Sequence, residues 1–345
     1  MRILLSQFRY PDDRLERQTL GREGELIVQT GSGGAWSTMP DDVRASIDGI
    51  IHSPPGTDVD GRPSDYPNAR ALVRSGVGYD GLDLEAWGRN GTAVFNVPDY
   101  GTSEVADHAI GLMLALTRGV VTYNDAIRAD PATGWTQGIA PAVRRLRDAV
   151  FGIVGLGRIG LAAAMRARSF GMRIAFYDPY LPSGMEIAVG AQRCASLHEL
   201  MAISDVVSIH APSSEATRGL IGAEALAHAK PGLILINTAR GSIVDLDALH
   251  DALRTGRIMA AGLDVLSKEP ADPAHPLIDA WRRRDEWLSG RLVLTPHAAF
   301  YSPSSVIDMR VKSMETVLRH LRSGDLANCV NREFLVRRPA RSGEE

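Results

Sequence analysis

The chain has 345 residues, of which 44% are hydrophobic and 23% charged, a composition typical of globular proteins. Its net charge of −3 argues against a protein that binds nucleic acid mainly through phosphate contacts. The length favours two domains over one, and no apolar run is long enough to span a membrane.

Cysteine usage points to a reducing compartment. The only two cysteines, Cys194 and Cys329, are far apart and lack metal-ligand spacing. Residues 1–13 contain too short an apolar run for a signal peptide. We therefore expect a cytoplasmic protein with no metal site.

Strand and helix patterns alternate over the first hundred residues. The patterns predict strands at 2–5, 48–52, 71–74 and 92–96, a helix at 82–89, a flexible loop at 31–34 and a turn at 53–56. A long helix is predicted from 103 to about 121, because apolar residues recur on one of its faces. Residues 130–147 indicate a loop. This alternation favours a first parallel sheet.

The stretch from Val150 to Asp178 carries the clearest motif. An apolar strand at 150–154 leads into a glycine-rich turn, a helix to Phe170 closed by Gly171, and a strand at 174–177 that ends in Asp178. The turn is Gly155-Leu156-Gly157-Arg158-Ile159-Gly160.

Each glycine of this turn suits a dinucleotide site. Gly155 permits a tight turn, Gly157 leaves the backbone open to a pyrophosphate, and Gly160 lets helix and strand pack closely. The helix N-terminus offers N–H groups to phosphate. Asp178 can accept hydrogen bonds from the adenosine ribose and would repel a 2′-phosphate, which predicts NAD rather than NADP.

The same alternation continues to about residue 300. Strands are predicted at 205–210, 233–237, 258–265 and 292–295, and helices at 223–229 and 246–254. This pattern predicts a doubly wound parallel sheet, whose ligands bind at the carboxyl ends of the strands.

Polar side chains follow three of these strands. Arg240, Glu269 and His297 suit a 2-oxo acid: imidazole exchanges a proton with the carbonyl oxygen, a carboxylate orients the imidazole, and guanidinium anchors the substrate carboxylate. Taken singly, each could be a strand-end or surface group; as a set beside a dinucleotide fold they favour catalysis. Asp264 contacts the nicotinamide carboxamide or caps a loop, and we favour the first reading.

Several stretches in order resemble the NAD-dependent D-2-hydroxyacid dehydrogenase family. They are RSGVGYDGLDL, VPDYGTSEVADHAIGLML, VGLGRIG, FYDPY, INTARGSIVD, AAGLDV with KEP, and TPHAA. The segment 166–181, TPHAAFYS and Asn328-Cys329-Val330-Asn331 are most similar to the C-terminal binding protein (CtBP) branch.

The resemblance implies two Rossmann or flavodoxin-like doubly wound domains. They are a substrate domain of 1–99 plus 300–335 and an NAD-binding domain of 100–299, with 336–345 a mobile tail. It also implies a homodimer through the NAD-binding domain. The implied substrate contacts are His52, Val77, Gly78, Tyr79, Arg240 and Phe300.

The resemblance also implies the cofactor contacts. Besides Gly155, Gly157, Arg158, Ile159, Gly160 and Asp178, they are Thr102, His210, Ala211, Pro212, Thr217, Thr238, Ala239, Arg240, Asp264, His297 and Ala299.

Two departures from the branch concern the substrate side. Phe300 stands where the branch usually has tryptophan, so it keeps an apolar wall but lacks the indole donor. The linker after Glu269 is longer than usual, and its pattern predicts an added amphipathic helix at 279–287. Its Trp281 and Trp287 could pack at the rim of the site or at a subunit contact, or the segment could be a plain surface helix.

Three functions stay open: a D-2-hydroxyacid dehydrogenase, an NAD(H)-sensing CtBP-like binding protein with little turnover, and a dehydrogenase of another small anion such as phosphite or formate. The Arg240, Glu269 and His297 set favours turnover, but CtBP-like relatives keep it too, so it does not exclude the binding role. Formate-specific relatives lack the Glu–His pair, which lowers that option.

Overall fold

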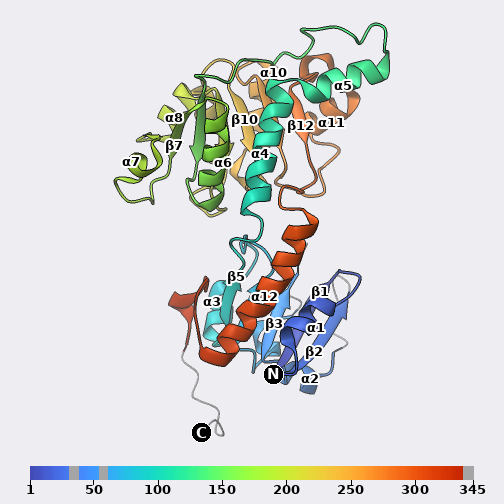
Figure 1. Cartoon of the computed structure of the whole chain (residues 1–345), viewed down its shortest axis with the longest axis vertical. Helices are drawn as coiled ribbons and strands as arrows, with labels where there is room; N and C mark the ends of the chain where they lie inside the picture. The colour runs from blue at the N-terminus through green and yellow to red at the C-terminus, as the bar shows by residue number, and fades with distance from the viewer. Residues whose placement is uncertain (31–38, 54–60, 337–345) are drawn as a thin grey trace. The chain divides into compact units, whose positions relative to one another are not determined.

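The computed structural model describes residues 1–30, 39–53 and 61–336, and divides into two compact units. Unit 1 is Met1–Gly101 with Ser302–Glu345, and unit 2 is Thr102–Tyr301. Each contains its own parallel sheet, so the predicted α/β class with two sheets is confirmed (Figure 1). The predicted domain boundaries lie beside this division, and the roles assigned to the domains stay predictions. The expected loop at 31–34, the turn beyond Ser53 and the tail beyond 336 fall outside the described residues.

Unit 1 is a five-stranded sheet in the order β2-β1-β3-β4-β5. Its strands are β1 (Arg2–Phe8), β2 (Glu25–Thr30), β3 (Gly49–His52), β4 (Ala71–Arg74) and β5 (Ala93–Asn96). Its helices are α1 (Arg14–Leu20), α2 (Asp41–Ala45), α3 (Leu84–Arg89) and α12 (Pro303–Ser323), with short 3₁₀ turns η2 (Pro63–Asp65) and η5 (Arg332–Phe334). The sequence pattern did not predict β2, α1 and α2, because the apolar residues are least regular there.

The C-terminal part of the chain completes unit 1. Helix α12 packs against α1, β3 and β4, as Figure 1 shows. The buried guanidinium of Arg310 donates to both carboxylate oxygens of Glu16 on α1, at 2.7 Å each. Beyond α12, the buried Asn331 accepts from the N–H of Val94 and donates to two carbonyls, those of Leu84 and Thr92. These bonds fix residues over two hundred positions apart in one core.

Unit 2 is a seven-stranded sheet in the order β12-β11-β10-β9-β6-β7-β8. Its strands are β6 (Val150–Val154), β7 (Arg173–Tyr177), β8 (Gln192–Arg193), β9 (Val206–Ile209), β10 (Ile234–Asn237), β11 (Ala260–Leu263) and β12 (Leu292–Leu294). Its helices are α4 (Thr102–Thr117), α5 (Val120–Ala129), α6 (Arg158–Ser169), α7 (Met185–Val189), α8 (Leu197–Ile203), α9 (Ala223–Ala227), α10 (Leu246–Arg254) and α11 (Pro276–Arg283), with 3₁₀ turns η3 (Gly241–Ile243) and η4 (Glu286–Leu288).

Helices cover both faces of the unit 2 sheet. Helices α4 and α6 pack on one face, and their contact is lined by small side chains such as Ala106, Ala109, Ala163 and Ala167. The other face is covered by residues of α8, α9, α10 and α11. Both faces are therefore apolar, as expected of a doubly wound sheet, and the open ends of the strands are left for polar residues.

The predicted single helix from 103 to about 121 is wrong. Helix α4 ends at Thr117, Gly119 takes a positive φ of 66°, and α5 starts at Val120 at an angle of 56° to α4. A Cβ at Gly119 would lie 2.6 Å from that of Ala140, so the break is built into the packing of the following loop. Within the described ranges, no single helix could cross a membrane, although this bent pair would pass on length and composition alone.

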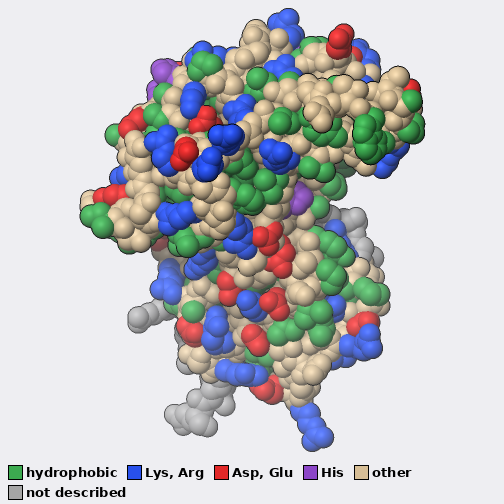
Figure 2. All heavy atoms as spheres, turned by 45° about the horizontal axis from the view of Figure 1, so that its top comes forward, with side chains coloured by type: hydrophobic (Ala, Val, Ile, Leu, Met, Phe, Trp, Pro, Cys, Tyr) green, Lys and Arg blue, Asp and Glu red, His purple; other side chains and the backbone are tan. Residues whose placement is uncertain are grey.

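Other predicted elements differ in extent. The strand expected at 258–265 is reduced to β11, and the helix expected at 279–287 is α11 followed by η4. Trp281 is 40% exposed, whereas Trp287 packs against the core edge-on to His250. On the face in Figure 2, acidic and basic side chains are interspersed over the surface.

Candidate active site

The glycine-rich turn has the geometry that its sequence predicts. Gly155 has a φ of 87°, and a Cβ there would lie 2.8 Å from the nitrogen of Ala211. A Cβ at Gly160 would lie 2.2 Å from the carbonyl oxygen of Gly155, whereas one at Gly157 would meet nothing within 4 Å. Gly155 and Gly160 are thus required by the fold itself, while Gly157 leaves open space beside the turn. Arg158 and Ile159 follow as the first residues of α6.

Asp178 directly follows β7 and is hydrogen-bonded to the same turn. Its Oδ2 accepts from the N–H of Leu156 at 3.0 Å, and its Oδ1 accepts from the N–H of Tyr180 at 3.0 Å. The carboxylate thereby fixes the loop after β7 against the turn. In dinucleotide-binding folds an acidic residue after this strand binds the adenosine ribose, and that role of Asp178 stays a prediction.

Two buried hydroxyl groups support the fit of a dinucleotide. The Oγ1 atoms of Thr102 and Thr238, both predicted cofactor contacts, have no hydrogen-bond partner among the described residues. Buried hydroxyl groups are normally satisfied, so an additional polar molecule is expected to reach these atoms. Together with the open space at Gly157, they fit a bound NAD(H), whose nicotinamide would exchange hydride with substrate.

Other predicted cofactor contacts occupy loops after β9 and β10. Burial lowers the pKa of His210 to about 4, and its Nε2 is 2.9 Å from the Ser208 hydroxyl. Thr217 closes the next loop by donating to the carbonyl of Pro212 at 2.7 Å. Ala211 lies against the glycine-rich turn, and Ala239 follows β10.

His297 and Glu269 form a direct pair. Nδ1 of His297 lies 2.7 Å from Oε2 of Glu269, and Oε1 of the same carboxylate accepts from the N–H of Leu266 at 2.9 Å. Burial works to raise the pKa of Glu269, but the hydrogen bonds from His297 and Leu266, with the charges of His297 and Arg240, lower it overall. The carboxylate thus stays ionised and occupies Nδ1 of the imidazole, so Nε2 is the ring nitrogen that a substrate contact would use.

Arg240 belongs to the same electrostatic environment, because its charge acts on Glu269. It is half-buried at the start of η3, its backbone carbonyl accepts from the Asn237 amide, and its Nη1 donates to the carbonyl of Ala239 at 2.7 Å. Gly241 comes next, and a Cβ there would overlap the backbone of Leu266. This glycine, which no motif in the sequence singles out, lets the segment carrying Glu269 approach Arg240.

Asp264 caps the loop that carries His297. Its buried carboxylate accepts from the N–H groups of Ala298 and Ala299 at 2.9 Å each, and from the Thr295 hydroxyl at 2.5 Å. These contacts favour the loop-capping reading that the sequence left as the second choice. They involve both carboxylate oxygens, so a contact with nicotinamide stays a prediction.

The predicted substrate contacts of unit 1 lie at the carboxyl ends of its strands. His52 is the buried last residue of β3 and pairs in register with Arg74, the last of β4. Val77, Gly78 and Tyr79 follow β4, and the carbonyl of Val77 accepts from the Asn96 amide at 2.8 Å. In unit 2, the ring of Phe300 lies edge-on to that of His297, with centroids 6.2 Å apart. The roles of all these residues stay predictions.

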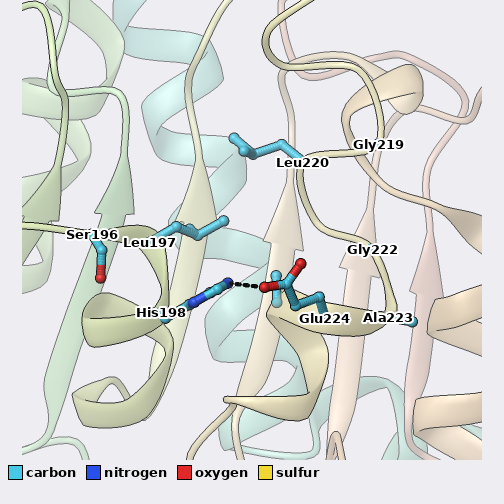
Figure 3. A pocket seen from close by; sticks show the side chains of 9 residues that line it. Ser196, Leu197, His198, Gly219, Leu220, Gly222, Ala223 and Glu224 are labelled. Atoms are coloured by element: carbon cyan, nitrogen blue, oxygen red, sulfur yellow. Dashed lines mark ion pairs between the residues drawn. The ribbon is translucent and has the colours of Figure 1, made fainter.

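A separate surface pocket lies between α8 and α9. Figure 3 shows His198 and Glu224 pointing toward each other across it, with Nε2 and Oε1 3.6 Å apart. Its volume is about 420 Å³, and its lining does not include the Arg240, Glu269 and His297 set. No cluster of three metal-ligating side chains occurs in the part of the chain that the structure describes.

Comparisons with known proteins agree with this geometry. Residues 110–299 match the family model for the D-isomer specific 2-hydroxyacid dehydrogenase, NAD binding domain. A glyoxylate reductase of Aeropyrum pernix is 37% identical over 281 residues, which are 80% of this chain and 81% of that protein.

Two solved structures have a similar fold. One is an NADPH-dependent glyoxylate/hydroxypyruvate reductase of Sinorhizobium meliloti in complex with NADP and malonate. It has a TM-score of 0.80 and 28% identity, over 98% of this chain and 99% of that one. The other is a D-lactate dehydrogenase of Aquifex aeolicus with NAD and lactic acid. It has a TM-score of 0.78 and 26% identity, over 95% and 99% of the two chains.

These relatives are reductases and dehydrogenases, and they do not support the expected closeness to the CtBP branch. They do support the broader prediction, because the matched domain includes the glycine-rich turn, Arg240, Glu269 and His297. The chain therefore belongs to the D-isomer specific 2-hydroxyacid dehydrogenase family, whose members are NAD(P)-dependent oxidoreductases.

Proposed function

We propose that this protein reduces a small 2-oxo acid to the D-2-hydroxy acid with NADH, with His297 as the proton donor. The observation that carries the proposal is the 2.7 Å contact between Nδ1 of His297 and Oε2 of Glu269. This contact leaves Nε2 to face a substrate, and the ionised carboxylate stabilises the imidazolium that donates the proton. In the reverse direction, neutral imidazole accepts that proton.

Arg240 is the proposed substrate anchor. Its guanidinium can bind a carboxylate through two parallel hydrogen bonds, a geometry that lysine lacks. Its charge acts on Glu269, so the anchor and the proton donor belong to one electrostatic unit. We assign the remaining substrate contacts to His52, Val77, Gly78, Tyr79 and Phe300.

Glyoxylate is the substrate we place first. The relatives at 36% and 37% identity are glyoxylate reductases. Phe300 beside His297 offers an apolar edge with no hydrogen-bond donor, so it suits a substrate with little polar surface beyond its carboxylate and carbonyl. Other small anions, such as phosphite, serve as competing substrates in the test.

NAD(H) is the proposed cofactor rather than NADP(H). The similar solved structures include one with NAD and one with NADP, so the family alone does not decide. The carboxylate of Asp178 is held beside the glycine-rich turn. A carboxylate there accepts hydrogen bonds from the ribose hydroxyl groups and repels a 2′-phosphate.

We also propose a homodimer formed through unit 2. Helix α5 contains no buried residue, and Val120 and Trp135 are 60% and 78% exposed. Hydrophobic side chains gather at this end of the unit in Figure 2. An apolar surface of this kind favours contact with a second copy. A cytoplasmic location stays a prediction from the two cysteines, both free in the structure.

The decisive experiment follows absorbance at 340 nm in both directions. NADH oxidation is measured with glyoxylate, hydroxypyruvate and phenylpyruvate, and NAD⁺ reduction is measured with phosphite and formate. We expect turnover on a small 2-oxo acid, reduced by about 10²- to 10⁴-fold in His297→Asn, because a general acid is lost. Absence of turnover on every acid, with tight NADH binding retained, would favour a CtBP-like NAD(H)-sensing role instead. Reduction of NAD⁺ by phosphite or formate, with no turnover of any 2-oxo acid, would favour the third function.

A further inference from the structure

A polar network connects helix α4 to the loop that carries His297. Nε2 of His108, on α4, lies 2.9 Å from Oγ1 of Thr295, which in turn lies 2.5 Å from Oδ1 of Asp264. His108 Nε2 is also 3.5 Å from that carboxylate oxygen. The Asp264 side chain is fully buried and that of His108 is 26% exposed. His108 lies on the same helical stripe as Val105 and Leu112, so a polar residue faces the core here.

The direction of these hydrogen bonds follows from their chemistry. Both carboxylate oxygens of Asp264 accept from the loop, so the single hydroxyl proton of Thr295 is donated to Oδ1 of Asp264. The oxygen of Thr295 can then only accept from His108, which must carry its proton on Nε2. His108 therefore adds a donor to a largely buried polar network, where an unmade hydrogen bond is costly.

The network ends on the backbone of His297. This residue has a φ of 53°, in the left-handed region that side-chain-bearing residues rarely adopt. Its N–H donates to the backbone carbonyl of Asp264 at 2.8 Å. The next two N–H groups, of Ala298 and Ala299, each donate to one of the two carboxylate oxygens of Asp264. Such a strained conformation persists because surrounding bonds determine it, and such sites cluster where function needs them.

We propose that His108 is a positioning residue for His297, acting through Thr295 and Asp264. The inference rests on the proposed role of His297. By donating to Thr295, His108 fixes the hydroxyl that orients the Asp264 carboxylate, and this carboxylate holds the loop that points the imidazole toward substrate. Glu269 orients the ring of His297 from one side, and the His108 network fixes its backbone from the other.

The test compares isosteric with conservative variants. Thr295→Val keeps the shape but removes the hydroxyl, whereas Thr295→Ser keeps the hydroxyl. His108→Leu removes the donor, whereas His108→Gln keeps an N–H. We expect Thr295→Val and His108→Leu to lower kcat about tenfold with little change in KM for NADH, since each leaves a buried polar group unsatisfied. The Ser and Gln variants should recover most of the loss.

Amide hydrogen exchange gives a readout that does not depend on turnover. Exchange at Ala298 and Ala299 should accelerate in Thr295→Val and His108→Leu, while amides of β6 and β10 keep their protection. Unchanged kcat and exchange, or failure of both conservative variants to rescue, would overturn the proposal. So would a general loss of protection, since it would mean a structural role only. If His297→Asn retained full turnover, the proposed function would fail, while the exchange data would still decide whether His108 holds the loop.

Discussion

The glycine-rich turn at 155–160 and the segment 264–300 both lie at carboxyl ends of strands in unit 2, but they are built differently. The shape of the turn depends on close backbone packing, because a Cβ at Gly155 or Gly160 would collide with neighbouring main-chain atoms. The segment depends on side-chain hydrogen bonds: Glu269 contacts the imidazole of His297, and Asp264 accepts from the loop beyond Thr295. Adding a side-chain atom should therefore disrupt the turn, whereas removing a hydrogen-bonding group should disrupt the segment.

This difference also concerns distance along the chain. The parts of the turn are consecutive residues, so their spacing is visible in the sequence. The parts of the second region are 28 and more residues apart, and only the sheet brings them together. Substitutions can therefore test each mode of construction separately.

The largest effect is expected from adding a methyl group to the turn. In Gly155→Ala, the new Cβ would sit 2.8 Å from a backbone nitrogen at a φ of 87°, so the turn must move. We expect a loss of roughly 1–3 kcal/mol in stability and at least tenfold weaker NADH binding. Thermal unfolding and fluorescence titration of NADH measure both.

Gly157→Ala is the matched control for this variant. Its Cβ meets no protein atom within 4 Å, so the melting temperature should equal that of the wild type. NADH affinity should still fall, because the methyl group occupies space proposed for the pyrophosphate. A Gly157→Ala protein that binds NADH normally would contradict the proposed cofactor position.

Removing the charge of Glu269 should have the next largest effect. In Glu269→Gln, the amide can still meet His297 but no longer stabilises imidazolium, so kcat should fall about 10- to 100-fold at neutral pH. KM for NADH should stay close to the wild-type value. Steady-state kinetics with the best oxo acid measures this, with Glu286→Gln as a control away from the site.

The pH dependence of stability follows from the lowered pKa of Glu269. Because folding lowers the pKa of this carboxyl below its ordinary value of 4.5, the ionised group stabilises the fold above pH 4.5. That stabilisation is lost as pH falls from 4.5 through the lowered pKa. Glu269→Gln should therefore unfold with a shallower dependence on pH in this acid range. If both proteins lost stability equally as pH falls below 4.5, the lowered pKa of Glu269 would be contradicted.

Local patterns predicted most of the sheet strands and the class of fold. Val150–Val154 and Ala71–Arg74 are short apolar runs bounded by turn residues, and both are strands with the predicted bounds. The break between α4 and α5 was not predictable, because Gly119 follows an apolar helical pattern that also continues beyond it. Its cause is contact with Ala140 in the next loop, which no local pattern contains.

Residue types and strand ends together were enough to pair His297 with Glu269. They did not indicate that both carboxylate oxygens of Asp264 accept from the loop, or that His108 contacts Thr295. Those contacts depend on the packing of α4 against the strands. A polar residue on the buried stripe of α4 was the only available signal.

A smaller effect is expected at Asp178, where the turn meets a side chain. Asp178→Asn keeps an oxygen for the N–H of Leu156 but removes the negative charge. We expect the preference for NADH over NADPH, as the ratio of kcat/KM values, to fall about tenfold, because the repulsion of a 2′-phosphate is lost. Asp178→Ala should weaken binding of both cofactors, since it also releases the turn. An unchanged ratio in Asp178→Asn would mean that other residues select the cofactor.

The smallest effect concerns His210, whose backbone lies against the glycine-rich turn while its imidazole contacts the hydroxyl of Ser208. Burial lowers its pKa from 6.5 to about 4, so the folded protein holds it neutral while the unfolded chain binds a proton below pH 6.5. Stability should therefore decline as pH falls from 6.5 toward 4. In His210→Gln this part of the decline should disappear, whereas the exposed His228→Gln should leave it unchanged. Chemical unfolding of the cofactor-free protein at pH 7 and pH 5 measures the difference. If His210→Gln lost as much stability between these pH values as the wild type, the acid sensitivity of unit 2 would arise from its carboxylates and not from this imidazole.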